Sequence, residues 1–172
     1  MNTTPENLAL EQAVATCDAH EEALQDALSD LAQRNVAAQD LLCLGKEDRR
    51  LLDQFAYRYT RLQDDMGARL IPAILIALGE AIAAMPAIDR LNRLEQLLWL
   101  PSADEWSDLR RIRNEFTHDY PETPQERYEK LQLAIASAHR LIGILGVFKK
   151  KLGERSSEVA TESKTHLARP SN

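Results

Sequence analysis

Residues that interrupt helices are scarce in this sequence. Among 172 residues there are six glycines and seven prolines, and aromatic side chains make up 5%. A β-sandwich or barrel needs many turns between short strands that are rich in β-branched and aromatic residues. Alanine, leucine, glutamate and arginine, which favour helices, are abundant instead. The composition therefore predicts an all-α protein, and the length fits one domain with its own core.

Cysteine and histidine are also few. Cys17 and Cys43 have no neighbour at the spacing of a zinc site, which favours reduced core thiols. His20, His139 and His166 have no credible ligand set around them. A glycine-rich phosphate loop and a His-Glu-x-x-His motif are both missing. We therefore predict neither a metal nor a cofactor.

Signals for export and for membrane insertion are missing as well. The N-terminal segment has no basic region followed by an apolar run, as a secretory signal would have. The longest apolar run, residues 70–79, is too short to span a bilayer. We therefore expect a cytoplasmic protein with no membrane partner.

The net charge of −6 argues against a general nucleic-acid coat, because non-specific affinity comes mainly from lysine and arginine contacts to phosphates. Acidic residues are concentrated near the N-terminus, where residues 1–40 hold eight acidic side chains and one basic one. Basic residues cluster at 110–113 and 149–151. A local basic site is therefore compatible with the acidic total. The lysines at 149–151 either complement a helix dipole or bind phosphate.

Apolar spacing and capping signals predict five helices joined by short connections. The expected helices cover residues 5–34, 47–77, 86–100, 103–119 and 124–153. Asn35 can end the first in a left-handed conformation, and a capping signal at residues 123–126 opens the last. In the third, the apolar residues expected to point inward are Ile88, Leu91, Leu94 and Leu98. Pro72 lies inside the second of them and removes an amide donor, so a kink is expected there. Residues 154–172 show no apolar period and few large apolar groups. We therefore expect a single helical domain over residues 1–153, followed by a disordered tail.

Some polar side chains fall on or beside the expected core faces. Glu21 is the one polar position on the apolar seam of the first helix, where it is either a carboxylate at the rim or a buried partner for an arginine. A polar line on the second helix contains Gln54, Arg58, Arg61 and Asp65. Such a line is usually a solvated face, although a subunit or a nucleotide could lie against it. We regard Arg58, Arg61 and Asp65 as supporting or interface residues.

The strongest chemical signal lies at the end of the fourth expected helix, where residues 110–120 read RRIRNEFTHDY. A capping box at residues 102–105 precedes this helix, and Pro121 disfavours helical geometry at the residue before it. The helix should therefore run from residue 103 to about residue 119. Its apolar stripe consists of Trp106, Leu109, Ile112 and Phe116.

Arg113 falls on the inward side of this helix, beside the apolar stripe. A guanidinium effectively never loses its proton, so it must find hydrogen-bond acceptors in the interior. The alternatives are Glu21, Asp64, Asp65 or a bound phosphate.

Asn114 and His118 are four residues apart and therefore lie on one side of the helix, with Arg110 one turn earlier as a supporting residue. Arg113 and His118 are about 140° apart around a straight helix. If these two act together, the helix must end near His118, or two copies must share the site across a symmetric interface.

A histidine and an arginine suffice for metal-independent cleavage of RNA. The imidazole of His118 can exchange the proton of a ribose 2′-hydroxyl or leaving oxygen, and the guanidinium of Arg113 can stabilise the phosphorane charge. Asn114 would orient one of them. Requiring an asparagine after the arginine and a tyrosine two residues after the histidine lowers the chance occurrence of the pattern to well under about one in a hundred.

The segment ADEWSDLRRIRNEFTHDYPE closely resembles the signature of HEPN-domain proteins, particularly the HepT-like toxins encoded beside minimal nucleotidyltransferases. Their pattern is an arginine, a polar residue that is often asparagine, three more residues, a histidine, one residue and a tyrosine. Arg113, Asn114, His118 and Tyr120 match it position by position. The resemblance extends over the helical context from residue 47 to residue 152.

The resemblance implies an up-and-down helical bundle that dimerises and places two copies of the motif at a shared cleft, where RNA is cut without metal. It also implies that a partner nucleotidyltransferase neutralises the toxin by attaching AMP to Tyr120. We therefore expect a homodimer with RNA as substrate and a nucleotidyltransferase as antitoxin. Two other interpretations stay open: a non-catalytic HEPN binding module that pairs with a nucleotidyltransferase, and a structural bundle in which Arg113 is a satisfied core arginine.

Overall fold

A computed structural model of the chain describes residues 4–118 and 123–167, with side chains described through residue 157. Its elements are α1 (Pro5–Arg34), the 3₁₀ turn η1 (Ala38–Leu42), α2 (Lys46–Asp65), the π turn η2 (Met66–Leu70), α3 (Ile71–Ala77), α4 (Ala87–Gln96), α5 (Ala103–His118) and α6 (Pro124–Leu167). No strand occurs within the described ranges. The prediction of an all-α helical bundle is confirmed.

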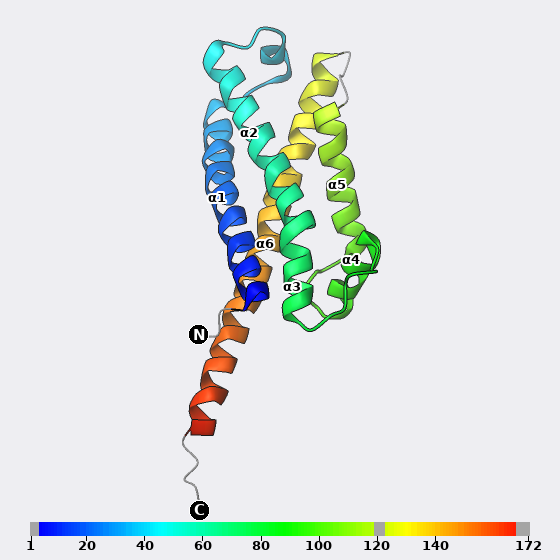
Figure 1. Ribbon diagram of the computed structural model, residues 1–172. Helices are drawn as coiled ribbons and strands as arrows, with labels where there is room; N and C mark the ends of the chain where they lie inside the picture. The colour runs from blue at the N-terminus through cyan, green and yellow to red at the C-terminus, as the bar shows by residue number, and fades with distance from the viewer. Residues whose placement is uncertain (1–3, 119–122, 168–172) are drawn as a thin grey trace, which may run out of the picture.

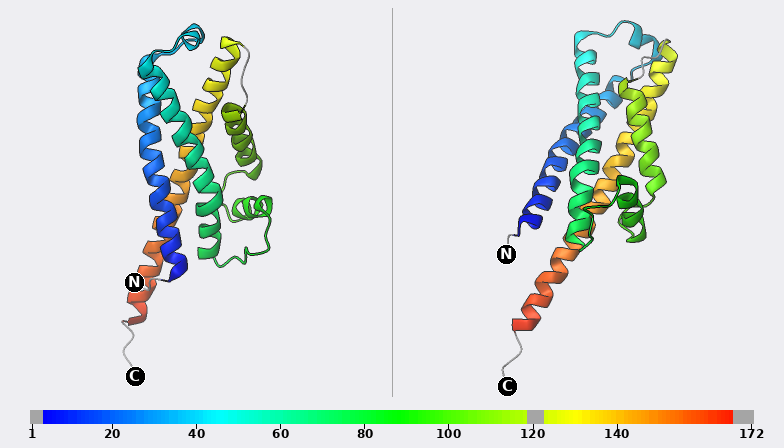
Figure 2. Two further views of the ribbon diagram at one scale, coloured as in Figure 1. Left: turned by 45° about the horizontal axis from the view of Figure 1, so that its top comes forward. Right: turned by 45° about the vertical axis from the view of Figure 1, so that its right-hand side comes forward.

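The long helices run alternately up and down the bundle (Figure 1). α1 leads to the end at which η1 lies, α2 and α3 return from it, α5 runs toward it again, and α6 returns a second time. α1 packs along α2, and α5 packs along α6. The short α4 lies crosswise beside α3 and α5, as the two further views show (Figure 2). α5 therefore packs against α6 of the bundle and also contacts the short α4.

The core follows the apolar periodicity of the sequence. The seam of α1 places Cys17, Leu24 and Leu28 in the interior, as expected from their spacing. The largest fully buried side chains come from α1, α2, η2, α3, α4, the connection after α4, and α6, and they include Phe55, Tyr59, Leu62, Met66, Ile74 and Phe148. Asn35 ends α1 in the left-handed conformation, with φ 49°, and its amide donates to the Leu31 carbonyl at 3.3 Å.

The expected kink at Pro72 takes the form of a π turn. α2, η2 and α3 are continuous from residue 46 to residue 77, and the π turn η2 directly precedes α3. The Ile71 amide donates to the Met66 carbonyl, five residues back. A π turn accommodates a residue that cannot continue the normal hydrogen-bond ladder, and Pro72 has no amide to contribute.

The connection after α4 differs from the prediction. Ile88 and Leu98 were expected to point inward with Leu91 and Leu94, but Ile88 is 49% and Leu98 is 78% exposed. The helix ends at Gln96, and Leu98 adopts the left-handed conformation with φ 60°. The Trp99 amide then donates to the Leu94 carbonyl at 2.9 Å, as in a Schellman cap. The left-handed residue faces solvent, and the chain buries Trp99 and the residue after it instead.

Two further predictions are corrected. Cys17 is a buried free thiol as expected, whereas Cys43 is exposed, because it follows the short turn η1 at the end of the bundle. The disordered tail expected from residue 154 onward is wrong for residues 154–167, which continue α6 to Leu167. Gly153, which was expected to end this helix, lies within it, and a Cβ added there would meet no neighbouring side chain. Residues 168–172 lie outside the described part of the chain.

α6 is also the one helix in the described residues that is long and apolar enough to cross a membrane by length and composition. An 18-residue window within Pro124–Ser157 has a mean hydropathy of 1.6 and is 44% buried. Leu141, Leu145 and Phe148 of this segment are fully buried in the bundle. Packing in the core therefore accounts for much of the apolar character of α6.

Candidate functional site

Capping hydrogen bonds mark the start of α5 and the start of α6. The Glu105 amide donates to Ser102 Oγ at 3.1 Å, which is half of the expected capping box at the start of α5. The Glu105 carboxylate makes no return bond to the cap, because it pairs with Arg140 of α6, whose hydrogen bond lowers the pKa of Glu105. Before α6, Thr123 and Glu126 form the full reciprocal box at 3.2 and 3.3 Å, as predicted. α5 is thereby tied to α6.

The apolar stripe of α5 anchors the helix against α2. Trp106 and Leu109 are buried, and Ile112 and Phe116 are partly buried. The Phe116 ring lies 5.7 Å from the Phe55 ring and 6.3 Å from the Tyr59 ring, between ring centroids. The stripe predicted from the sequence is therefore the inner face of α5, and it fixes the rotation of the helix about its axis.

Arg113 is held by two consecutive residues of α2. Its Nε donates to Gln63 Oε1 at 3.0 Å, and its Nη2 donates to Asp64 Oδ1 at 2.6 Å. The Arg113 side chain is 12% exposed, and that of Asp64 is 43% exposed. Of the partners considered from the sequence, Asp64 is confirmed, whereas Glu21 and Asp65 pair elsewhere. Gln63 was not foreseen, although it stands beside Asp64 in the sequence.

A cavity of about 390 Å³ adjoins this arginine. It lies between η2, α4 and α5, and its charged lining residues are Asp64, Arg90, Arg110 and Arg113. η2 and α5 are close at this point, since a Cβ built on Gly67 would lie 3.5 Å from the Trp106 ring, in ordinary van der Waals contact. Arg90 was missed from the sequence, because only the crosswise placement of α4 brings it beside α5.

The other motif residues lie on the exposed side of α5. Asn114 and His118 are exposed, and no hydrogen bond of either side chain is found among the described residues. α5 is continuous from Ala103 to His118, so Arg113 and His118 diverge by the roughly 140° expected for a straight helix. The Thr117 hydroxyl donates to the Arg113 carbonyl at 2.9 Å in the last turn. Tyr120 lies outside the described residues.

Two of the residues proposed as supporting the site belong to a different cluster. Arg58 Nη1 lies 3.1 Å from His20 Nδ1, and His20 Nε2 lies 3.2 Å from Asp65 Oδ2. An arginine can only donate, so Nδ1 of His20 carries the lone pair and Nε2 carries the proton that bonds to Asp65. The Asp65 residue is 6% exposed. Arg58 and Asp65 therefore join α2 to α1 and do not face the cavity, while Arg61 is exposed.

Lys149 and two carboxylates of α1 form a second, partly exposed ion-pair group, which joins α6 to α1. Lys149 Nζ lies 2.9 Å from Asp18 Oδ1 and 2.5 Å from Glu21 Oε2, and the Glu21 side chain is 13% exposed. Burial lowers the pKa of Lys149, but the hydrogen bonds to Glu21 and Asp18 outweigh it and raise the pKa above its ordinary value. Glu21 is thus a largely buried ion-pair partner, of a lysine and not of an arginine. The first lysine of the run at 149–151 has a structural role.

Burial is also strong at Cys17, which lies on the same part of α1. It raises the pKa of the thiol to about 12, and the nearby carboxylates of Asp65, Asp18 and Glu21 add to the effect. A thiol of this kind is protonated and unreactive at neutral pH.

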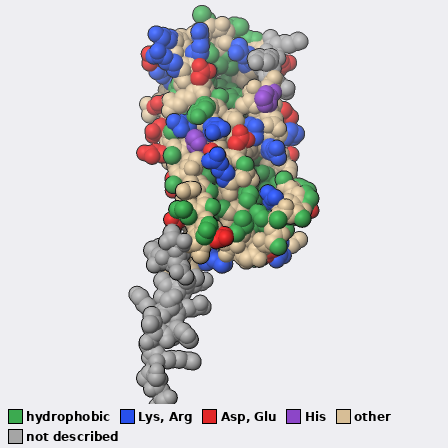
Figure 3. Space-filling model, in the orientation of Figure 1, with side chains coloured by type: hydrophobic (Ala, Val, Ile, Leu, Met, Phe, Trp, Pro, Cys, Tyr) green, Lys and Arg blue, Asp and Glu red, His purple; other side chains and the backbone are tan. Residues whose placement is uncertain are grey.

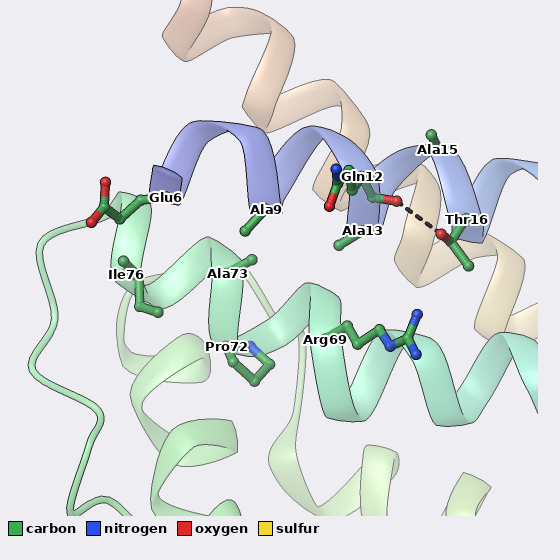
Figure 4. Close-up of a pocket in the computed structure, with 10 residues that line it drawn as sticks. All are labelled: Glu6, Ala9, Gln12, Ala13, Ala15, Thr16, Arg69, Pro72, Ala73 and Ile76. Atoms are coloured by element: carbon green, nitrogen blue, oxygen red, sulfur yellow. Dashed lines mark hydrogen bonds between the residues drawn. The ribbon is translucent and has the colours of Figure 1, made fainter. Parts of the chain in front are cut away.

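A larger groove of about 700 Å³ lies between the first half of α1 and α3 (Figure 4). It is open and lined mainly by small side chains, among them Ala9, Ala13 and Ala73. Its charged lining residues are Glu6 and Arg69. None of the motif residues lines this groove, so its size alone does not make it the functional site.

Basic and acidic side chains are mixed on the face of the molecule that carries α2, α3 and α5 (Figure 3). Both lie over its upper and middle part, and hydrophobic side chains gather lower, over α3 and α4 (Figure 3). In the part of the chain that the structure describes, no group of three or more potential metal ligands is found.

Comparison of the chain with protein-family models, with curated proteins and with solved structures finds no match.

Proposed function

We propose that this protein is a HEPN-type, metal-independent endoribonuclease, the toxin of a toxin–antitoxin system whose partner is a minimal nucleotidyltransferase. The proposal rests on the match of Arg113, Asn114, His118 and Tyr120 to the HEPN signature. It places the protein in the cytoplasm, where its RNA substrates and its partner are. Arg113 stabilises the transition state, His118 transfers the proton, and Asn114 orients one of them.

The observation that carries the proposal is the arrangement of Arg113 on α5. Its Nε and Nη2 are fixed by Gln63 and Asp64, so the guanidinium is oriented before any substrate arrives. Preorganised donors stabilise developing charge best, because no reorganisation is needed during the reaction. His118 is exposed in the last turn of the same helix, where it can exchange protons with a bound substrate.

Two copies of the chain form the complete site. The unbroken helix separates Arg113 and His118 of one chain by about 140° and by a rise of about 7.5 Å. In a symmetric dimer, the arginine of one chain and the histidine of the other can approach the same phosphate. We propose that α5 and part of α2 form this dimer interface.

Regulation follows from the resemblance. In HepT-like toxins the partner attaches AMP to the tyrosine that corresponds to Tyr120. An added adenylyl group would introduce bulk and a negative phosphate next to His118, two residues away, and would repel an RNA backbone. The proposal therefore includes Tyr120 as the position of control.

Purified protein should cleave single-stranded RNA in the presence of EDTA. His118→Ala should lower the cleavage rate by about 10²- to 10⁴-fold, the usual contribution of a general acid or base. His139→Ala is the matched control, because His139 is an exposed histidine on α6. Cleavage by His118→Ala at the rate of the unchanged protein would exclude this assignment.

The second proposal is a non-catalytic HEPN module that binds a nucleotidyltransferase. The net charge of −6 and the ion pair of Arg113 with Asp64 favour it, since both reduce attraction for RNA. Stable capture of the partner, together with no RNA cleavage by freshly purified chain without an adenylyl group, would support this second function against the first.

A further inference from the structure

The cavity between η2, α4 and α5 has an excess of positive charge. Arg90, Arg110 and Arg113 line it, against one carboxylate, that of Asp64, which gives a net charge of +2. The whole chain carries −6. Asp64 pairs with Arg113, and within the described residues neither Arg90 nor Arg110 forms an ion pair. The cavity is therefore a positive site on an acidic protein.

Hydrogen-bond donors are also in excess around this cavity. In the described part of the chain, three buried side-chain atoms have no hydrogen-bond partner: Thr60 Oγ1, Gln63 Nε2 and Arg90 Nε. Gln63 and Arg90 both line the cavity. Because Arg113 can only donate, Gln63 must turn its Oε1 to Arg113, which leaves Nε2 as the free donor. Gln63 is 3% exposed, so a missing partner there is costly.

We infer that this cavity binds a phosphate group through Arg90, Arg110 and Arg113. A phosphate presents acceptor oxygens and negative charge, and it would supply the countercharge that Arg90 and Arg110 do not have among the described residues. The volume of about 390 Å³ is near the lower end of ligand sites, so it holds about one nucleotide and not a long stretch of chain. Leu91 and Trp106 supply apolar wall beside it.

Two sources can supply this phosphate: the backbone of an RNA strand, or a free nucleotide. The inference rests on the proposed function only if the ligand is RNA. In that case a backbone phosphate in the cavity would lie beside Arg113 and hold the RNA strand near α5. Arg90 and Arg110 lie outside the residues assigned to catalysis. Binding can therefore be measured separately from cleavage.

The test is calorimetric titration of the full-length chain with three probes: inorganic phosphate, AMP and a short single-stranded RNA. The chain carries His118→Ala, so that RNA stays intact. Arg90→Gln and Arg110→Gln should each weaken binding by about tenfold to a hundredfold, as expected for a lost hydrogen bond to a charged group. Arg111→Gln is the matched control, because Arg111 is exposed, pairs with Asp108 and Glu115, and does not line the cavity. It should change affinity by less than about twofold.

Three outcomes support the inference and two overturn it. If RNA binds and AMP does not displace it, the ligand is a backbone phosphate. If AMP binds and RNA does not, the ligand is a nucleotide. If each displaces the other, the cavity binds both. Absence of saturable binding of all probes overturns the inference, and so does equal weakening by Arg110→Gln and Arg111→Gln. Arg90 also donates to the Ile82 carbonyl, so Arg110→Gln, at an exposed side chain, is the decisive variant if Arg90→Gln unfolds. Binding without any RNA cleavage by the unmodified chain would reject the ribonuclease and leave the phosphate site standing.

Discussion

Two regions of this bundle combine arginine, histidine and carboxylate side chains, one between α1, α2 and α6 and the other around α5. In the first, which we call the closed network, Arg58, His20 and Asp65 are bonded to one another, and Lys149 pairs with neighbouring carboxylates of α1. In the second, the open cavity, three arginines and one carboxylate line the same space. His118, five residues after Arg113 on α5, is exposed. The same residue types are therefore paired with one another in the closed network, whereas in the open cavity the arginines outnumber the carboxylates.

The difference separates a structural cluster from a site that can take a ligand. In the closed network, donors meet acceptors within the chain, and nothing is left to bind. In the open cavity, three guanidinium groups line a space with one carboxylate, so positive charge is left for a ligand to neutralise. A histidine beside an arginine is thus no sign of function by itself. The balance of hydrogen bonds around it decides.

The largest expected effect of the closed network is on the reactivity of the thiol beside it. Cys17 lies beside the closed network with its pKa raised to about 12, so its thiolate fraction at pH 8 is lower than that of an ordinary thiol by roughly a thousandfold. Cys43 is exposed. An alkylating reagent at pH 8 should modify one thiol per native chain, identified by mass spectrometry as Cys43, and both in denaturant. Equal rates at the two thiols would show that the closed network opens readily.

Removal of a buried carboxylate should have the next largest effect. Asp65→Ala leaves Arg58 without its compensating charge across His20, and loss of one partner in a buried ionic cluster costs about 3 kcal/mol in the free energy of unfolding. Urea denaturation followed by circular dichroism measures this. Asp53→Ala is the control, because Asp53 is an exposed carboxylate on the same helix. A cost below about 0.5 kcal/mol for Asp65→Ala would contradict a closed, interdependent network.

The carboxylate of Asp64, the residue before Asp65, should contribute much less to the free energy of unfolding. Asp64 is 43% exposed, and its pair with Arg113 at one edge of the open cavity should contribute about 1 kcal/mol or less to stability. Asp64→Ala should nevertheless strengthen phosphate binding in the cavity, because it removes the acceptor that competes for Arg113. A loss of phosphate affinity in this variant, measured in the same titration, would mean that Asp64 supports the ligand and does not compete with it.

Features set by local chemistry could be predicted from the sequence. The seam of α1, the left-handed end at Asn35 and the start of α5 all depend on residues within a few positions of one another. The contact of Arg113 with Asp64 was among the alternatives, since an inward guanidinium requires an acceptor. The sequence could not choose among the carboxylates, because the choice depends on how α2 and α5 are rotated against each other.

Features set by tertiary placement could not be predicted. Arg90 and Gln63 line the same cavity only because the fold places α4 and the end of α2 beside α5. Leu98 looked like a core residue by its spacing, but α4 ends before it and the chain turns. Arg58 and Asp65 shared a face with Arg61, yet α1 covers two of the three. Helical period reports which residues share a face and not which neighbour covers that face.

The central claim is that Arg113 of one chain and His118 of another act at one site, and a mixed dimer tests it most directly. Arg113→Ala and His118→Ala chains, each expected to be inactive alone, are coexpressed with different tags, and the doubly tagged dimer is purified. That dimer keeps one complete site of two, so it should cleave RNA in EDTA at about half the rate of the unchanged dimer. Activity no higher than that of either parent would contradict the shared site.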